Sequence, residues 1–237
     1  MIDLYGMSSP SVLKVTILIE ELGLPYRYHP VNVAGGEQFA PGFVALNPNS
    51  RVPVIVDEDG PDGAPYTIFE SGAILFYLAE KTRRFLPLDV RGRHDTMQWL
   101  MIQMANVGPM FGQLNHFQKY APPGNDYSLS RYRTASGRLY DMLDRRLAEV
   151  PYLIGDDYTI ADIAIYPWAA LYHEKHGEDW GRHPALHAWA ERVGARPAVA
   201  RAVAAYDGRL ATDPSQRPDQ PQDGIDRVFG WGKYARA

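Results

Sequence analysis

The part of the chain that decides its fold reads Arg51-Val52-Pro53-Val54-Ile55-Val56 and, after a turn-rich loop, Phe69-Glu70-Ser71-Gly72-Ala73. A residue ahead of proline is pushed into extended geometry. If the Val52-Pro53 bond is also cis, the Val52 amide and carbonyl face outward instead of entering a sheet. Such a backbone edge can pair with a short peptide as an added strand does. The stretch therefore predicts a peptide-binding edge at Val52.

Glu70 and Ser71 stand at the start of an apolar helical run, residues 72–80. Free backbone N–H groups and the positive end of the helix dipole gather at such a start. One alternative is that both residues only cap the helix, since Ser and Glu are favoured there. Their position close to the Val52 edge favours a ligand that carries both an ammonium and a carboxylate group, and glutathione is such a ligand.

The elements around this stretch are expected in the order βαβαββα, which is typical of a small thioredoxin-like domain. Ser9 followed by Pro10 predicts a helix start, and Gly23 predicts its end. The expected strands are residues 2–5, 26–33, 53–56 and 66–69, and the expected helices are residues 10–22, 39–46 and 72–80.

Beyond residue 82 the pattern becomes helical throughout, so an all-α C-terminal domain is expected. We predict a domain at residues 1–82, a linker at 83–91, a helical domain at 92–210 and a tail at 211–237. The tail is rich in Pro, Asp and Gln and forms no core of its own. The expected helices are residues 93–120, 127–150, 161–176, 184–193 and 197–206, and the residues expected to dock the tail are Val228, Phe229, Trp231 and Tyr234.

Composition excludes several functional classes. The 237 residues carry a net charge of −4, so no basic surface predicts nucleic-acid binding. The start lacks the pattern of a signal peptide, and no apolar run is long enough for a membrane span, so we expect a cytoplasmic protein. There is no cysteine. Any thiol or disulfide chemistry must therefore use a sulfur atom that belongs to a bound cosubstrate.

Three serines, Ser8, Ser9 and Ser11, lie at the first strand-to-helix turn. Each can be a helix cap. A hydroxyl beside a bound thiol can also donate to the sulfur, and together with a helix N-terminus it lowers the pKa of that thiol. Both roles are compatible.

Two further motifs lie in the helical part. Thr159 to Asp162 is a capping-box-like motif before an apolar run, so Asp162 is expected to be structural. His173 and His176 are three residues apart with a carboxylate between them, which leaves a metal site open as an alternative. A solvated helix face is the favoured interpretation, and no metal is expected.

The motifs together resemble the cytosolic glutathione S-transferases over roughly residues 1–210. The resemblance rests on residues 47–53, 69–74 and 159–162. Residues 108–117, Arg131-Tyr132 and the opening residues 1–5 are similar to the bacterial nu-class branch, which is related to the yeast nitrogen-regulation prion protein. In the turn, nu-class relatives carry Thr and Asn where this chain has Ser9 and Ser11.

The resemblance implies a thioredoxin-like domain followed by an all-helical domain, in a homodimer. It implies that Val52, before cis-Pro53, pairs with the cysteinyl backbone of glutathione and that Glu70 and Ser71 hold its γ-glutamyl end. It further implies catalytic roles for Ser9 and Ser11. Other implied contacts to the peptide are Gln38, Asn49, Arg51 and, from across a dimer, Arg131.

The leading hypothesis is a glutathione-dependent thiol–disulfide oxidoreductase, which binds one or two glutathione thiols or the oxidised dimer. Its partners would be a second copy of the chain and a small disulfide, peroxide or electrophile, with a role in detoxification. One alternative is conjugation of glutathione to small electrophiles. Another is a non-catalytic, glutathione-binding regulatory protein.

Overall fold

A computed structural model describes residues 1–214 and 222–234. The chain forms two compact units, which we treat separately. The first unit combines residues 1–74 with residues 201–237, and the second comprises residues 75–200. The first unit is therefore built from both ends of the chain. The domain boundaries given above from the sequence stay predictions.

The first unit contains a four-stranded mixed sheet in the order β2-β1-β3-β4. Strand β1 runs parallel to β2 and antiparallel to β3, and β3 runs antiparallel to β4. The predicted βαβαββα order and thioredoxin-like fold are confirmed. The elements are β1 (Ile2–Gly6), α1 (Pro10–Leu22), β2 (Tyr26–Pro30), the 3₁₀ turn η1 (Glu37–Phe39), α2 (Pro41–Leu46), β3 (Val54–Asp57), β4 (Tyr66–Phe69) and α3 (Ser71–Thr82).

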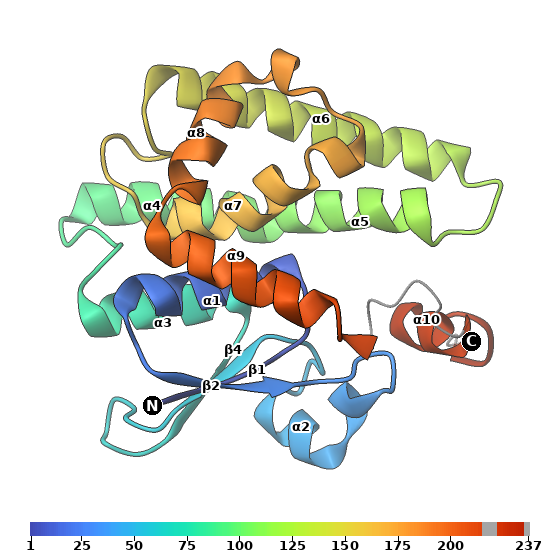
Figure 1. The fold of residues 1–237 in the computed structure, drawn as a ribbon, viewed down its shortest axis with the longest axis horizontal. Coiled ribbons are helices and arrows are strands. Elements are labelled where there is room, and N and C mark those ends of the chain that lie inside the picture. The colour runs from blue at the N-terminus through green and yellow to red at the C-terminus, as the bar shows by residue number, and fades with distance from the viewer. Residues whose placement is uncertain (215–221, 235–237) are drawn as a thin grey trace. The chain divides into compact units, whose positions relative to one another are not determined.

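Helix α1 begins and ends where local chemistry dictates. The Ser9 hydroxyl caps its first turn, Pro10 occupies the first helical position, and Gly23 ends it at φ 68°. Helices α1 and α2 cover opposite faces of the sheet (Figure 1). Phe43 of α2 packs with Val31 and Val54 in a small buried cluster. This packing fixes the loops at the carboxyl end of β1.

The second unit is helical, as predicted. The expected long helix over residues 93–120 is divided by a π-helical segment, because Pro109 has no N–H to donate to the Ala105 carbonyl. The central helix of this unit is α7, whose residues 160–167 are all buried. The elements are α4 (Val90–Ile102), the π segment η2 (Gln103–Val107), α5 (Gly108–Lys119), α6 (Asp126–Glu149), α7 (Ile160–Tyr172), η3 (Glu174–His176), η4 (Trp180–Arg182) and α8 (Pro184–Gly194).

The C-terminal segment returns to the first unit. Helix α9 (Pro197–Leu210) leads into it, and α10 (Gln222–Phe229) and η6 (Gly232–Tyr234) follow. Arg227 of α10 donates to the Gly35 carbonyl at 2.6 Å. Of the residues expected to dock the tail, Trp231 is 61% exposed, which contradicts the prediction for that residue, whereas Tyr234 is half-buried. The hydrogen bond of Arg227 to the Gly35 carbonyl is a polar contribution to the attachment.

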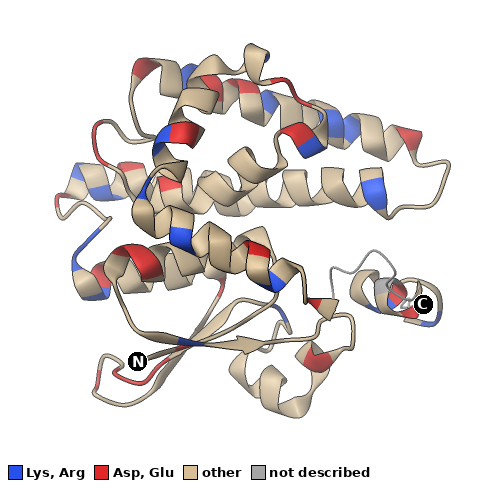
Figure 2. Cartoon of the chain, in the orientation of Figure 1, with Lys and Arg blue, Asp and Glu red and all other residues tan. Residues whose placement is uncertain are grey.

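In the view of Figure 2, acidic and basic residues are interspersed along the helices of the second unit. Within the described residues, no helix is both long and apolar enough to span a bilayer.

Candidate functional site

The strand register brings four loops of the first unit to one end of the sheet, the end where β1, β2 and β4 finish and β3 begins. We call this end the sheet edge. Tyr5 pairs with Val54, and Val54 pairs with Phe69. Gly6, at the end of β1, pairs with Pro30 at the end of β2. The turn after β1, the loop after β2, the residues before β3 and the residues after β4 must therefore meet at this edge. Together with the first turn of α1, these segments contain every predicted site residue except Arg131.

The first of these loops and the helix turn that follows it carry the two predicted catalytic serines. Ser9 has extended backbone angles, and its Oγ accepts from the Val12 N–H at 3.4 Å. Because the cap uses the oxygen only as an acceptor, the hydroxyl proton stays available to a ligand. Ser11 lies on the first turn of α1 and is half-buried. The turn thus offers two hydroxyls at a helix N-terminus.

The residues before β3 form an ordered loop with an exposed face. The Val52–Pro53 peptide bond is cis. Strand β3 begins only at Val54, so the Val52 backbone lies outside the ladder. The buried Asn47 side chain organises the loop: its Nδ2 donates to the Arg51 carbonyl at 2.7 Å, and its Oδ1 accepts from the Asn49 N–H at 2.9 Å. Asn49 and Arg51 themselves are exposed.

Glu70 adopts a backbone conformation that is rare for its residue type, at φ 66°. It connects β4 to α3 with an exposed side chain, and Ser71 follows as the buried first residue of α3. A strained backbone persists only where the surrounding structure enforces it, and such residues are frequent at active sites and ligand sites. The exposed Glu70 carboxylate thus stands directly before the N-terminus of α3.

Gln38 lies in η1 and is only 4% exposed. Its Oε1 is buried and accepts no hydrogen bond from a described residue. A buried acceptor without a partner is costly, so a donor from a ligand would stabilise it. Arg131 lies elsewhere, on α6 of the second unit, where it lines a cavity with Tyr127 and Arg138.

Sequence reasoning missed Lys14, whose side chain is 1% exposed on α1. Burial lowers the pKa of its ammonium to about 7, and the charge of Glu70 opposes that shift. The negative charge of Glu70 therefore stabilises the ammonium form of the buried Lys14. The signal was present, because Lys14 is the one charged residue inside the apolar run Val12–Ile19.

Asp213 was missed as well. Its Oδ2 accepts from the Ser8 N–H at 2.6 Å, across 205 residues of sequence. The segment after α9 therefore holds the peptide that directly precedes Ser9. No local pattern in the sequence connects these two positions.

In the second unit, the structure corrects the prediction for His173 and His176. They do not lie on a solvated helix face, since they are 0% and 2% exposed. The Tyr140 hydroxyl lies 2.8 Å from His176 Nδ1, and His173 Nε2 lies 2.9 Å from His183 Nδ1. Burial lowers the pKa of both His173 and His176 to about 4. Within the described part of the chain, no three His, Asp or Glu side chains are placed to hold a metal ion.

The capping box at Thr159 and Asp162 is confirmed. The buried Asp162 carboxylate also accepts from the Leu153 N–H and from the Trp189 indole, both at 3.0 Å. Burial raises the pKa of Asp162 to about 6, although these donors oppose the rise. Asp162 thus fastens the start of α7 to two other segments of its unit.

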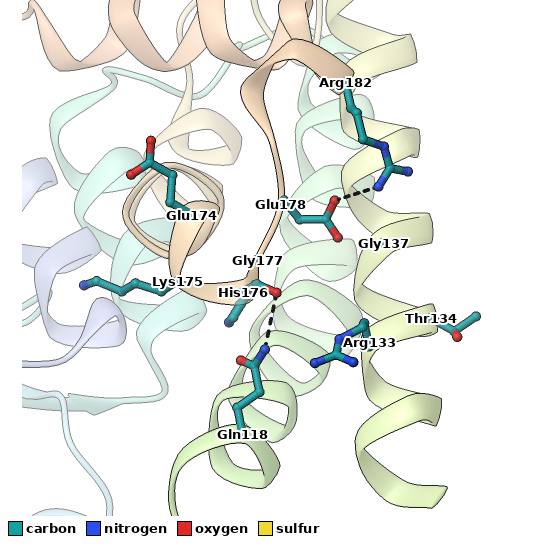
Figure 3. Close-up of a pocket in the computed structure, with 10 residues that line it drawn as sticks. All are labelled: Gln118, Arg133, Thr134, Gly137, Glu174, Lys175, His176, Gly177, Glu178 and Arg182. Atoms are coloured by element: carbon teal, nitrogen blue, oxygen red, sulfur yellow. Dashed lines mark hydrogen bonds and ion pairs between the residues drawn. The ribbon is translucent and has the colours of Figure 1, made fainter. Parts of the chain in front are cut away.

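Figure 3 shows a cavity of about 480 Å³ in the second unit, between α5, α6 and the segment that follows α7. Gln118 Nε2 donates to the His176 carbonyl at 3.3 Å, and Arg182 pairs with Glu178 at 3.4 Å. The sequence-predicted site residues do not line it. Its lining carries charged groups of both signs.

Comparison with known proteins identifies the family. Residues 8–81 match the glutathione S-transferase N-terminal domain, and residues 117–197 match the C-terminal domain. The chain is 44% identical over 204 residues to the disulfide-bond oxidoreductase YfcG of Escherichia coli K12, covering 86% of this chain and 94% of YfcG. It belongs to the glutathione S-transferase superfamily.

Solved structures of glutathione transferases support this assignment. One from Burkholderia graminis, with two glutathione molecules bound per subunit, is 42% identical with a TM-score of 0.80, covering 85% of this chain and 87% of that one. Ure2p in complex with glutathione is 30% identical with a TM-score of 0.80, covering 86% and 92%. Within the superfamily, this transferase belongs to the nu-class branch related to Ure2p.

Proposed function

We propose that the protein is a glutathione-dependent thiol–disulfide oxidoreductase. The observation that carries the proposal is the convergence, at one sheet edge, of a helix N-terminus with two serines, an unpaired strand edge at Val52 and the strained Glu70. These features fit the thiol, the peptide backbone and the ammonium end of glutathione. The similarity to YfcG, a disulfide-bond oxidoreductase, supports the reaction type.

The chemistry takes place on the substrates' own sulfur atoms, because the chain has no cysteine. Bound glutathione loses its thiol proton, and its thiolate attacks one sulfur of a disulfide RSSR. A glutathione–SR bond forms, the S–S bond breaks, and RS⁻ leaves and takes up a proton. The thiolate of a second glutathione then attacks the mixed disulfide. The products are one oxidised glutathione and two RSH.

The residues of the first unit have distinct roles in this scheme. Ser9 and Ser11 donate to the sulfur, and the N-terminus of α1 adds its partial positive charge, so the bound thiol ionises at lower pH. Val52 pairs with the cysteinyl backbone, and Glu70 binds the γ-glutamyl ammonium. The remaining proposed contacts to glutathione are Gln38, Asn49, Arg51, Pro53 and Ser71.

We further propose that the protein acts as a homodimer in which Arg131 of one subunit reaches the glutathione held by the other. The cytoplasm is the proposed location, because glutathione is kept reduced there. Sedimentation of the purified protein measures the oligomeric state. A monomer that retains full activity would contradict the role given to Arg131.

Turnover of bis(2-hydroxyethyl) disulfide, compared with turnover of 1-chloro-2,4-dinitrobenzene, tests the reaction. Both assays contain glutathione. We expect the disulfide to be the better substrate. Preference for the aryl chloride would favour conjugation instead. Tight glutathione binding without turnover of either compound would favour a regulatory protein.

The serine roles are tested on the same assay. Ser9→Ala removes one neutral hydrogen bond to sulfur, so the rate should fall about 10-fold, which is about 1.4 kcal/mol of barrier. Ser9→Ala/Ser11→Ala should lose more and should shift the midpoint of the pH–rate profile upward. Thr159→Ala is the control, because it removes a helix cap far from the serines in sequence and in the other unit. If the double variant reacts at the wild-type rate, neither serine stabilises the thiolate, and their role is limited to capping the helix.

A further inference from the structure

A cavity of about 330 Å³ in the first unit borders the predicted catalytic turn. One wall contains Gly6, Met7 and Ser8, directly before Ser9. Another is the segment that follows α9, with Arg209 and Asp213. Tyr28 and Glu37 line it as well. None of the residues assigned above to glutathione lines this cavity, so it is a separate space beside the same turn.

Arg209 lines this cavity and forms no ion pair with any residue that the structure describes. Its guanidinium carbon lies 4.3 Å from the centre of the Tyr28 ring. Its Nε is buried and donates no hydrogen bond to a described residue. By contrast, Arg201 on the same helix pairs with Glu20 at 2.9 Å. A guanidinium fixed by stacking, with an unused buried donor, suits a carboxylate from a ligand.

The cavity also holds two carboxylates whose positions are fixed. Asp213 is bound to the Ser8 N–H, and Glu37 Oε2 accepts from the Asn32 N–H at 2.6 Å. Both hydrogen bonds leave the negative charge in place. One guanidinium and two carboxylates together complement a group that carries a carboxylate and an ammonium. An α-amino acid is such a group.

We propose that this cavity binds the α-amino-acid end of the disulfide that the glutathione thiolate attacks. The substrate carboxylate binds Arg209, and its ammonium faces Asp213 and Glu37. Since Ser8 lines the cavity and Ser9 is the next residue, a disulfide held in this way has its sulfur atoms close to the proposed thiolate at Ser9. The inference rests on the proposed function and narrows its substrates to disulfides of amino acids and their short derivatives.

The test compares kcat/KM for L-cystine with that for bis(2-hydroxyethyl) disulfide, which carries neither charge. Oxidised glutathione is measured through glutathione reductase and NADPH. The wild-type protein should prefer cystine. Arg209→Gln should lower kcat/KM for cystine about 10-fold or more, the loss expected for a charged hydrogen bond, and change the neutral disulfide little. The matched control, Arg201→Gln, removes an arginine of the same helix and should not alter the preference.

Binding of S-methyl-L-cysteine, followed by calorimetry without any turnover, provides the second measurement. Arg209→Gln should weaken this binding about 10-fold. If the protein reduces no disulfide but the variant loses binding, the proposed reaction fails and the cavity assignment stands. Equal loss on cystine and the neutral disulfide, or unchanged binding of S-methyl-L-cysteine by the variant, would overturn the assignment.

Discussion

Asp162→Ala should destabilise the protein by about 3 kcal/mol, well beyond the loss of a helix cap. The carboxylate is fully buried and accepts from the Leu153 N–H at 3.0 Å, the Thr159 N–H at 3.1 Å and the Trp189 indole at 3.0 Å. Alanine leaves three donors without an acceptor in the core of the second unit. The change tests whether Asp162 joins three segments or merely starts a helix.

The magnitude follows from these contacts. A hydrogen bond to a charged group contributes roughly 1.5–3 kcal/mol, and each orphaned buried donor costs about 1–3 kcal/mol. Removing the carboxylate also removes the cost of burying its charge, which is the cost that raises the Asp162 pKa to about 6. This gain offsets part of the free energy lost with the three hydrogen bonds, so the expected net destabilisation is about 3 kcal/mol. The value lies within the range for removing one partner of a buried, charged hydrogen-bond network.

Urea and thermal unfolding, followed by circular dichroism, measure the effect. At roughly 2–4 °C per kcal/mol for a chain of this size, Tm should fall by about 6–12 °C. Thr159→Ala removes only the cap and should cost about 1 kcal/mol. KM for glutathione should stay unchanged in the folded variant. If Asp162→Ala lowers the free energy of unfolding no more than Thr159→Ala does, the hydrogen bonds to Leu153 and Trp189 do not stabilise the fold, and the predicted magnitude is wrong.

Two further predictions concern charge. Glu70→Ala should weaken glutathione binding by about 2 kcal/mol, because the ligand ammonium loses its charged partner; an unchanged Kd by calorimetry would place the γ-glutamyl end elsewhere. Tm should also fall as the pH drops from about 6.5 to 4. In that interval the unfolded chain binds protons at His173 and His176 that the folded chain, with histidine pKa values of about 4, does not bind. Asp162, whose pKa is raised to about 6, acts in the opposite direction, but it is one group against two. A Tm that stays constant across this interval would contradict the neutral, buried state of the two histidines.

The parts of the fold that follow from short-range chemistry could be predicted from the sequence. Ser9, Pro10 and Gly23 bound α1 as expected, because capping and backbone restrictions act within a few residues. Strand β4 has the predicted limits. The capping box at Thr159 is equally local. The edge that gathers the predicted site residues of the first unit also follows, since the order of the elements determines which loops meet.

Contacts between distant segments could not be predicted in this way. The spacing of His173 and His176 favours one turn of a surface helix. In the structure the Trp180 ring stacks on the His173 ring, with 3.7 Å between the ring centres, and covers it. Arg209 lies in the last turn of α9, and a basic residue at that position indicates only the end of a helix. Its stacking on Tyr28 depends on where α9 terminates, which no short window of sequence encodes. The glutathione contacts themselves remain predictions for the assays above.

The hydrogen bond between Ser8 and Asp213 has a consequence for how the protein is made. On the ribosome, the first strand and helix emerge early, whereas Asp213 emerges more than two hundred residues later. Closing an unstructured loop of that length costs about 5 kcal/mol of chain entropy. The turn that we propose to bind the thiol therefore reaches its final structure only when nearly the whole chain has been synthesised. A nascent chain stalled before α9 would carry Ser9 and Ser11 but lack the Asp213 carboxylate that accepts from the Ser8 N–H.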